Sequence, residues 1–157
     1  MQTPATVFLG QTGIAYSVHS YEHDPAAPSF GLEAAARLEL DPSAVFKTLM
    51  ARLDDDRGPL VVAIVPVKER LNLKALARAG SAKRAVMAAV ADAERSSGYV
   101  AGGISPFGQR RKVPTFIDET AEICDQVHVS GGQRGFDIGV APVDLINSLD
   151  AVVAPLT

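Results

Sequence analysis

Two apolar stretches, residues 45–53 and 60–65, constrain the fold of this chain of 157 residues more than any other feature. An acidic segment that ends in Gly58 separates them, and this pattern predicts two strands joined as a β-hairpin. Successive side chains of a strand point to opposite faces. Apolar residues occur on both faces of the first stretch, so we expect other elements to cover it on both sides.

Helix and strand signals alternate irregularly along the rest of the chain. Thr3 followed by Pro4 is typical of a helix start, and Gly13 of its end. Further helices are expected at residues 32–38, 72–79, 92–97 and 142–149. Further strands are expected at residues 16–21, 115–117, 126–129, 136–140 and 152–154. This mixture favours one compact α+β domain over residues 1–157 rather than a regular doubly wound sheet.

Composition excludes several classes of protein. Hydrophobic residues make up 47% and charged residues 21% of the chain, as in ordinary soluble domains. No apolar run approaches the ~18 residues of a membrane-spanning helix, and no leader is recognised before Thr3, so we expect no membrane partner. The single Cys124 excludes an internal disulfide and favours a cytoplasmic location. The net charge of −3 means that any contact with RNA requires a local basic patch.

Two glycine-paired loops, at residues 102–106 and 130–135, are the strongest sign of a ligand site. Adjacent glycines carry no Cβ atoms, so backbone N–H groups there can approach a bound oxygen closely. Pro106 restricts Ser105 to extended backbone and so stiffens the first loop. The alternative is a pair of tight turns with no role in binding.

Lys47 stands among apolar residues in the first predicted strand. It shares a face with Val45 and Leu49, where a lysine must form a pair, extend to an edge or face a cavity. The functional interpretation is a fixed ammonium directed at an anionic or carbonyl oxygen. The alternative is a side chain that reaches solvent at the nearby strand end.

Basic residues gather after the hairpin and beside the glycine loops. Those expected to contact RNA are Lys68, Arg70, Lys74, Arg110, Arg111, Lys112 and Arg134. Most such clusters are simply solvated faces, so the charge pattern alone favours a nucleic-acid site only weakly.

Several familiar catalytic machineries are absent. The chain has neither a Walker A loop nor a G-x-S-x-G nucleophile turn. His19 and His23 fall on a predicted strand and the loop after it, a spacing that does not suit a metal pair. Cys124 is expected to be an inert buried thiol. The sequence therefore predicts no metal, no other cofactor and no obvious nucleophile of its own.

The motifs resemble those of the bacterial YbaK-type Cys-tRNA(Pro) deacylases. The resemblance lies, in order along nearly the whole chain, in residues 21–24, 45–49, 66–67, 71–74, 102–108, 114, 117–118 and 130–138. It implies a compact α+β domain with a curved, barrel-like mixed β-sheet surrounded by short helices. It also implies removal of mischarged cysteine from tRNA(Pro). The wider superfamily includes the editing domain inserted into bacterial prolyl-tRNA synthetases.

The resemblance also implies a mechanism in which the substrate supplies the nucleophile. The cysteine thiol would attack its own carbonyl and leave as a cyclic thiolactone, a lyase-type cleavage that well-oriented intramolecular attack could assist by ~7–11 kcal/mol. Catalysis would depend on Lys47, which would hold phosphate or ester oxygens, and on the N–H groups of Gly102 and Gly103, which would stabilise developing charge. The other residues expected to bind substrate are Tyr21, Thr48, Ile104, Ser105, Pro106, Ser130, Gly131, Gly132 and Asp137.

Alternatives to this activity stay open at the level of sequence. The enzyme could prefer Ala- or Ser-tRNA, because one methylene changes discrimination only ~10–200-fold. It could instead be a non-catalytic module that binds tRNA or a synthetase, or a small-molecule thioester or ester hydrolase. The expected partner is the acceptor end of tRNA(Pro). A transient complex with prolyl-tRNA synthetase would explain how so small a domain selects its tRNA.

Overall fold

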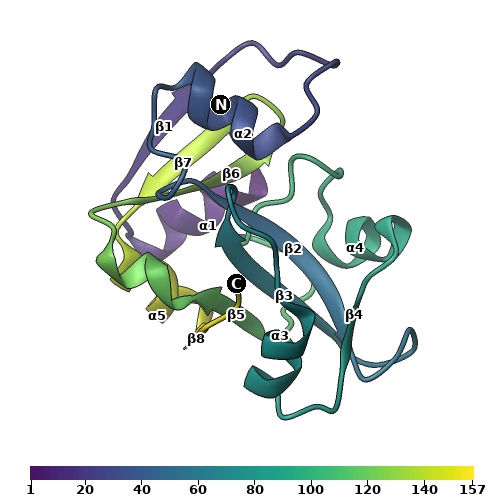
Figure 1. Ribbon diagram of the computed structural model, residues 1–157. Coiled ribbons are helices and arrows are strands. Elements are labelled where there is room, and N and C mark those ends of the chain that lie inside the picture. Colours follow the sequence, from purple (N-terminus) through teal and green to yellow (C-terminus); the bar gives the residue numbers. More distant parts are fainter.

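A computed structural model describes residues 1–157, and it contains five α-helices, one 3-10 helix and eight strands (Figure 1). The helices are α1 (Pro4–Thr12), α2 (Phe30–Arg37), α3 (Leu73–Ala79), α4 (Val90–Ser97), α5 (Pro142–Leu149) and the 3-10 helix η1 (Glu119–Ile123). The strands are β1 (Tyr16–Ser20), β2 (Phe46–Leu53), β3 (Leu60–Pro66), β4 (Ala85–Met87), β5 (Thr115–Asp118), β6 (Val127–Gln133), β7 (Phe136–Val140) and β8 (Val152–Ala154). Every predicted helix and strand is present, and β4 and η1 are additional.

Short polar side chains fix the starts of three helices. Thr3 and Thr6 cap α1 reciprocally, because each hydroxyl accepts a hydrogen bond from the other residue's backbone N–H. Ser29 and Asn72 cap α2 and α3 by accepting from N–H groups of the first turn. Such caps satisfy donors that have no partner inside the helix. The Ser29 cap explains why α2 begins at Phe30, earlier than the start at residue 32 that the sequence predicted.

The strands form two sheets. The five-stranded sheet has the order β4-β2-β3-β5-β8, antiparallel from β4 to β3 and parallel from β3 to β8. The predicted hairpin is confirmed, since β2 and β3 pair from Phe46 with Pro66 to Arg52 with Leu60. The three-stranded sheet has the antiparallel order β1-β7-β6.

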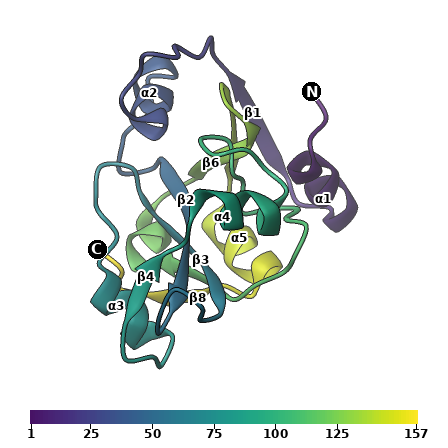
Figure 2. The same ribbon diagram turned by 90° about the vertical axis from the view of Figure 1, so that its right-hand side faces the viewer.

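The two sheets meet where β2 begins beside β6. Val45 forms a bridge with His128, and the N–H of His128 donates to the carbonyl oxygen of Ala44 at 2.9 Å. The strands therefore follow a curve from one sheet into the other without closing a barrel (Figures 1 and 2). The α+β fold with a curved mixed sheet and short surrounding helices is confirmed.

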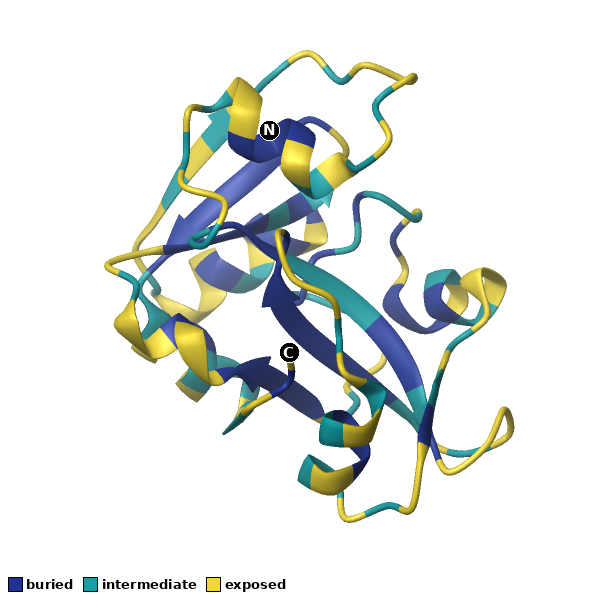
Figure 3. Cartoon of the chain, viewed as in Figure 1, coloured by how far each residue is buried: buried dark blue, intermediate teal, exposed yellow.

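Apolar layers cover both faces of β2. Phe46 and Met50 contribute to a core that also includes buried residues of α1, α5 and the three-stranded sheet. Ala51 and Leu53 point the other way and pack with α3. Figure 3 shows β3 buried along most of its length beside β2. None of the helices combines the length and apolarity that crossing a membrane requires.

Candidate active site

A cavity of about 390 Å³, here called the central cavity, lies against β2. Its wall combines residues 45–50 at the start of β2, the start of α2, the end of β4, the start of α4, and parts of the loops that contain the paired glycines. Figures 1 and 2 show these elements arranged around β2. The volume falls in the ~300–1,000 Å³ range of pockets that bind small molecules.

Lys47 lines the central cavity and is half-buried. It belongs to none of the four ion pairs in the structure. Burial first, and then the nearby charge of Arg70, lower the pKa of the Lys47 ammonium from its ordinary value of 10.5. An uncompensated ammonium in a partly dry cavity can attract an anionic or carbonyl oxygen more strongly than a solvated lysine can.

A carboxyl group and several hydroxyl groups line the same cavity, among them those of Tyr21 and Thr48. Burial raises the pKa of Asp137 to about 7, from an ordinary value of 3.8. Burial, followed by the charges of Asp137 and Glu33, raises the pKa of Tyr21 to about 12, so its phenol stays protonated. The Thr48 hydroxyl is buried and has no hydrogen-bond partner. Buried polar groups without partners are costly, and a ligand that bonds them recovers that cost.

The two glycine-paired loops contact each other at the cavity. Gly102 lines the cavity with a φ of +86°, a left-handed conformation that side chains disfavour. A Cβ atom there would lie 2.7 Å from Arg134 Nε and 2.8 Å from a ring carbon of Phe30. A Cβ atom on Gly103 would lie 3.0 Å from the backbone nitrogen of Arg134. Small residues are therefore required where the loops meet.

Gly102 and Gly103 differ in what their backbones can offer a ligand. The N–H of Gly103 donates to the Val100 carbonyl at 2.8 Å, so that donor is used within its own turn. Gly103 is also buried and does not line the central cavity, whereas Gly102 does. Of the two predicted donors, Gly102 is the one beside the cavity.

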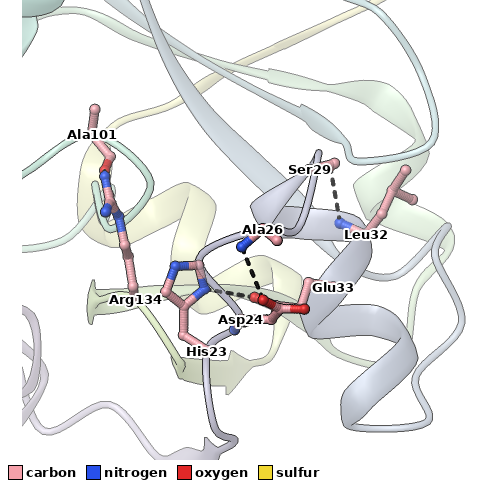
Figure 4. A network of polar contacts seen from close by, with 8 residues as sticks. All are labelled: His23, Asp24, Ala26, Ser29, Leu32, Glu33, Ala101 and Arg134. Carbon is pink, nitrogen blue, oxygen red and sulfur yellow. Dashed lines mark hydrogen bonds and ion pairs between the residues drawn. The ribbon is translucent and has the colours of Figure 1, made fainter.

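A chain of polar and aromatic contacts holds these loops against α2, and Figure 4 shows its polar members Arg134, Ala101, His23 and Glu33. Arg134 Nε donates to the Ala101 carbonyl at 2.9 Å, and Nη2 donates to the same oxygen. The Arg134 guanidinium lies 4.7 Å from the ring centre of Phe30, whose other neighbour is the ring of His23. His23 Nδ1 in turn lies 2.7 Å from a carboxylate oxygen of Glu33 in α2.

Glu33 anchors the far end of this chain of contacts. Its second carboxylate oxygen accepts the N–H of Asp24 at 2.7 Å. Burial alone raises the pKa of Glu33, but the bonds from His23 and from the Asp24 backbone outweigh it and leave the pKa below its ordinary value of 4.5. Glu33 is therefore an ionised, fully engaged structural anchor rather than an acid available for catalysis.

The predicted substrate-binding residues separate into two groups. Those that line the central cavity are Tyr21, Lys47, Thr48, Gly102, Ile104, Ser130 and Asp137. Those outside its wall are Gly103, Ser105, Pro106, Gly131 and Gly132. Members of the second group support the loops: the Ser105 hydroxyl is fully buried and accepts from the N–H of Phe107, and Gly132 packs against the ring of Tyr99.

The predicted RNA-contacting residues are spread over several surfaces. Lys68 and Lys74 are exposed, Lys68 beside a separate polar hollow and Lys74 in α3. Lys112 is exposed and pairs with Asp150 at 3.1 Å. Arg70 lies close enough to Lys47 for its charge to lower the pKa of the Lys47 ammonium. Arg134 donates hydrogen bonds to the Ala101 carbonyl. Arg110 and Arg111 are exposed where the chain passes the end of α4.

Most apolar residues of the cavity wall were not predicted from the sequence, and the large, exposed ones among them are Phe30, Met87 and Val90. These three residues are 36%, 48% and 62% exposed respectively. Exposed apolar side chains at the edge of a cavity are suited to contact an apolar part of a ligand. The sequence offered no signal, because exposure cannot be read from residue type.

Cys124 and His128 lie away from the central cavity, beside a polar hollow of about 760 Å³. Burial, then the charges of Asp41 and Asp125, raise the pKa of the Cys124 thiol. Burial and the proximity of His19 lower the pKa of His128. No group of three or more His, Cys, Asp or Glu side chains is placed to hold a metal ion.

Residues 24–147 match the model of the family described as "Aminoacyl-tRNA editing domain". A curated protein of Enterococcus faecalis (strain ATCC 700802 / V583), provisionally named Cys-tRNA(Pro)/Cys-tRNA(Cys) deacylase EbsC, is 35% identical over 123 residues. The match covers 78% of this chain and 74% of that protein. The chain therefore belongs to the aminoacyl-tRNA editing domain family.

Solved structures share the fold at lower identity. The crystal structure of hypothetical protein APE2540 has a TM-score of 0.86 and 21% identity, covering 98% of this chain and 99% of the other. A crystal structure provisionally described as a trans-editing enzyme for prolyl-tRNA synthetase has a TM-score of 0.84 and 22% identity, covering 100% and 98% of the two chains. The family that the sequence motifs predicted, and with it a function in aminoacyl-tRNA editing, is confirmed.

Proposed function

We propose that this protein removes cysteine from mischarged Cys-tRNA(Pro) by cleaving the aminoacyl ester. The observation that carries the proposal is the content of the central cavity: it holds the Lys47 ammonium and the Asp137 carboxyl, but neither a cysteine nor a histidine. A site with charge stabilisers and without an activated nucleophile suits a substrate that brings its own. The cysteine side chain of the substrate has the required thiol.

The proposed reaction is an intramolecular acyl transfer. The substrate thiol loses its proton and its sulfur attacks the ester carbonyl carbon, which places negative charge on the carbonyl oxygen. Lys47 and the N–H of Gly102 stabilise that oxyanion, an effect worth about 3–4 kcal/mol per donor in other acyl-transfer sites. The carbon–oxygen ester bond then breaks, the tRNA hydroxyl takes up a proton, and a cyclic thiolactone leaves.

Asp137 is proposed to bind the α-ammonium of the aminoacyl group. Its buried carboxyl has a pKa of about 7 in the free protein, and a cation beside it would favour the ionised form. The wall of the cavity is otherwise mostly apolar, and its hydroxyl groups belong to Tyr21, Ser29, Thr48 and Ser130. Such a pocket accepts a small side chain and limits the access of water.

Selection of tRNA(Pro) is proposed to come from outside this domain, through a transient complex with prolyl-tRNA synthetase. A chain of 157 residues can cover the acceptor end of a tRNA while leaving the anticodon untouched. The basic residues Lys68, Arg70, Lys74, Arg110, Arg111 and Lys112 are proposed to contribute RNA contacts, whereas the side chain of Arg134 is bound to the Ala101 carbonyl. Equal selectivity among Cys-tRNAs with and without the synthetase would refute the complex.

The decisive experiment is a panel of tRNA(Pro) molecules charged with cysteine, serine, alanine and S-methylcysteine. We expect rapid loss of cysteine and near-background loss of the others, because only cysteine has a free thiol. S-methylcysteine is the sharpest control, since it keeps the sulfur and blocks its attack. Comparable rates for serine and cysteine would contradict the thiol mechanism. Binding without turnover on any of the four would favour a non-catalytic module.

A further inference from the structure

A second pocket, of about 340 Å³, lies on the opposite side of α4 from the central cavity, and we call it the arginine pocket. Its wall is formed by Arg52, Leu60, Asp92, Arg95, Ser96, Arg111 and Val113. Val90 and Ala93 of α4 line the central cavity, while Asp92, Arg95 and Ser96 of the same helix line the arginine pocket. One helix, about 10 Å across, therefore separates the two sites.

The arginine pocket carries an excess of positive charge, and a carboxylate orients two of its three guanidinium groups. Asp92 pairs with Arg52 at 3.1 Å and with Arg95 at 3.0 Å, so a single carboxylate orients two guanidinium groups. The side chain of Arg111 forms neither an ion pair nor a hydrogen bond. Three cations therefore face one anion, which leaves the pocket suited to a further negative group.

Donors remain free after the internal bonds are counted. A guanidinium has five N–H donors. Arg52 donates one hydrogen bond to Asp92 and one to the carbonyl oxygen of Gly58, and Arg95 donates one to Asp92. Guanidinium groups form paired hydrogen bonds with phosphate oxygens, and pre-oriented groups lose little freedom on binding.

Ser96 supplies an independent sign of a ligand. It is 5% exposed, and its hydroxyl oxygen has no hydrogen-bond partner. Its carbonyl accepts the N–H of Arg111 at 3.0 Å, which ties the Arg111 backbone to the end of α4. A buried hydroxyl without a partner in the wall of a cationic pocket can donate to a phosphate oxygen.

We propose that the arginine pocket binds a backbone phosphodiester of the RNA whose aminoacyl end occupies the central cavity. The proposal rests on the function proposed above. The nucleotide next to the charged terminal adenosine must leave the central cavity by one of its edges, and α4 forms one of them. A phosphate held across this helix would fix the direction in which the acceptor end enters.

The test is the binding of uncharged tRNA(Pro) to the whole protein, measured by fluorescence anisotropy over a range of salt concentrations. The variants are Arg95→Gln, Arg111→Gln, the double variant and Ser96→Ala. Arg95 and Arg111 are exposed, so their replacement leaves the core intact. The matched control is Arg78→Gln, an exposed arginine of α3 outside both pockets.

We expect about tenfold weaker binding for the double variant, as the loss of charged hydrogen bonds predicts. We also expect the slope of log affinity against log salt to become shallower by roughly 0.7–0.9 for the lost phosphate contact. Ser96→Ala should weaken binding by a smaller factor, and Arg78→Gln should behave like the wild type. Wild-type affinity and slope in the double variant would overturn the proposal.

The same experiment separates this proposal from the proposed function. If the wild type cleaves Cys-tRNA(Pro) while the pocket variants bind RNA normally, the phosphate site alone is refuted. If the wild type neither binds nor cleaves the charged RNA, the editing function itself is refuted. A titration with inorganic phosphate, followed through the amide signals of Ser96 and Arg111, tests whether the pocket binds a free anion instead. If phosphate saturates these signals at a lower concentration than RNA does, the assignment of the pocket to RNA is overturned.

Discussion

Arg134 donates two hydrogen bonds to the carbonyl oxygen of Ala101, the residue that precedes Gly102 at the central cavity. The sequence favoured an RNA contact for this arginine, whereas its geometry suits the positioning of the first glycine loop. We expect Arg134→Met to lower kcat about 10–100-fold with little change in KM, because a displaced loop misplaces the Gly102 N–H. Steady-state deacylation of Cys-tRNA(Pro) measures both constants. A rise in KM alone would instead assign Arg134 to RNA binding.

Lys47→Ala tests the ammonium in the cavity. We expect kcat/KM to fall about 10²–10³-fold, the usual effect of removing one oxyanion donor. The fold should persist, because Lys47 is half-buried and holds no ion pair that its loss would break. Lys83→Ala, at an exposed lysine before β4, is the control and should keep full activity. Near-normal turnover by Lys47→Ala would remove Lys47 from the mechanism.

Gly102→Ala tests the contact between the loops. A Cβ atom there would meet Arg134 and Phe30, and the left-handed backbone costs a side chain about 1–2 kcal/mol. We expect urea denaturation to show a stability loss of about 1–3 kcal/mol, together with a strong loss of deacylation. Gly10→Ala is the opposite case, because Gly10 lies inside α1 with open space around it. It should gain up to about 1 kcal/mol of stability and keep its activity.

Asp137→Asn tests the buried carboxyl. The folded-state pKa of about 7 lies above the ordinary value of 3.8, so the folded protein holds a proton that the unfolded chain releases between these values. The free energy of unfolding therefore falls as pH rises through this window, by up to about 4 kcal/mol in all. Asparagine has no such proton, so the stability of Asp137→Asn relative to wild type should rise from pH 4 to pH 7. Parallel pH profiles in urea denaturation would argue against a raised pKa.

Cys124→Ala separates a substrate thiol from an enzyme thiol. The Cys124 Sγ lies 3.5 Å from the Thr120 carbonyl oxygen, outside the wall of the central cavity, and burial raises its pKa. A thiol in this state is a poor nucleophile. We expect deacylation to stay within about twofold of wild type, as is usual for replacements outside a site. Loss of turnover with an intact circular dichroism spectrum would instead assign the attack to Cys124.

Most secondary structure could be predicted because its signals are local. Thr3 with Pro4 begins α1, and Asn72 begins α3, through hydrogen bonds within one helical turn. The strand β4 escaped prediction because its three residues are too few to show an alternating pattern. Its pairing with β2 is a contact between distant parts of the chain.

Only part of the candidate site could be predicted, because sequence signals are local and contacts between distant segments are not. Lys47 could be selected because one strand face is apolar except for its ammonium. Phe30 and Arg134 could not be paired, because their contact requires α2 and the β6–β7 turn to meet. Ser96 was likewise invisible, since a missing hydrogen-bond partner is a property of the folded surroundings.

The amino-acid order by itself determined the short helices, the central hairpin and membership of an editing family, because each depends on neighbouring residues or on motifs in fixed order. Only the tertiary structure decided that Gly102 rather than Gly103 lines the cavity, that Arg134 holds Ala101, and that arginines of β2 and α4 share a pocket. These outcomes depend on how two sheets bend toward each other. Burial, and the pKa values that follow from it, exist only once distant segments have packed together.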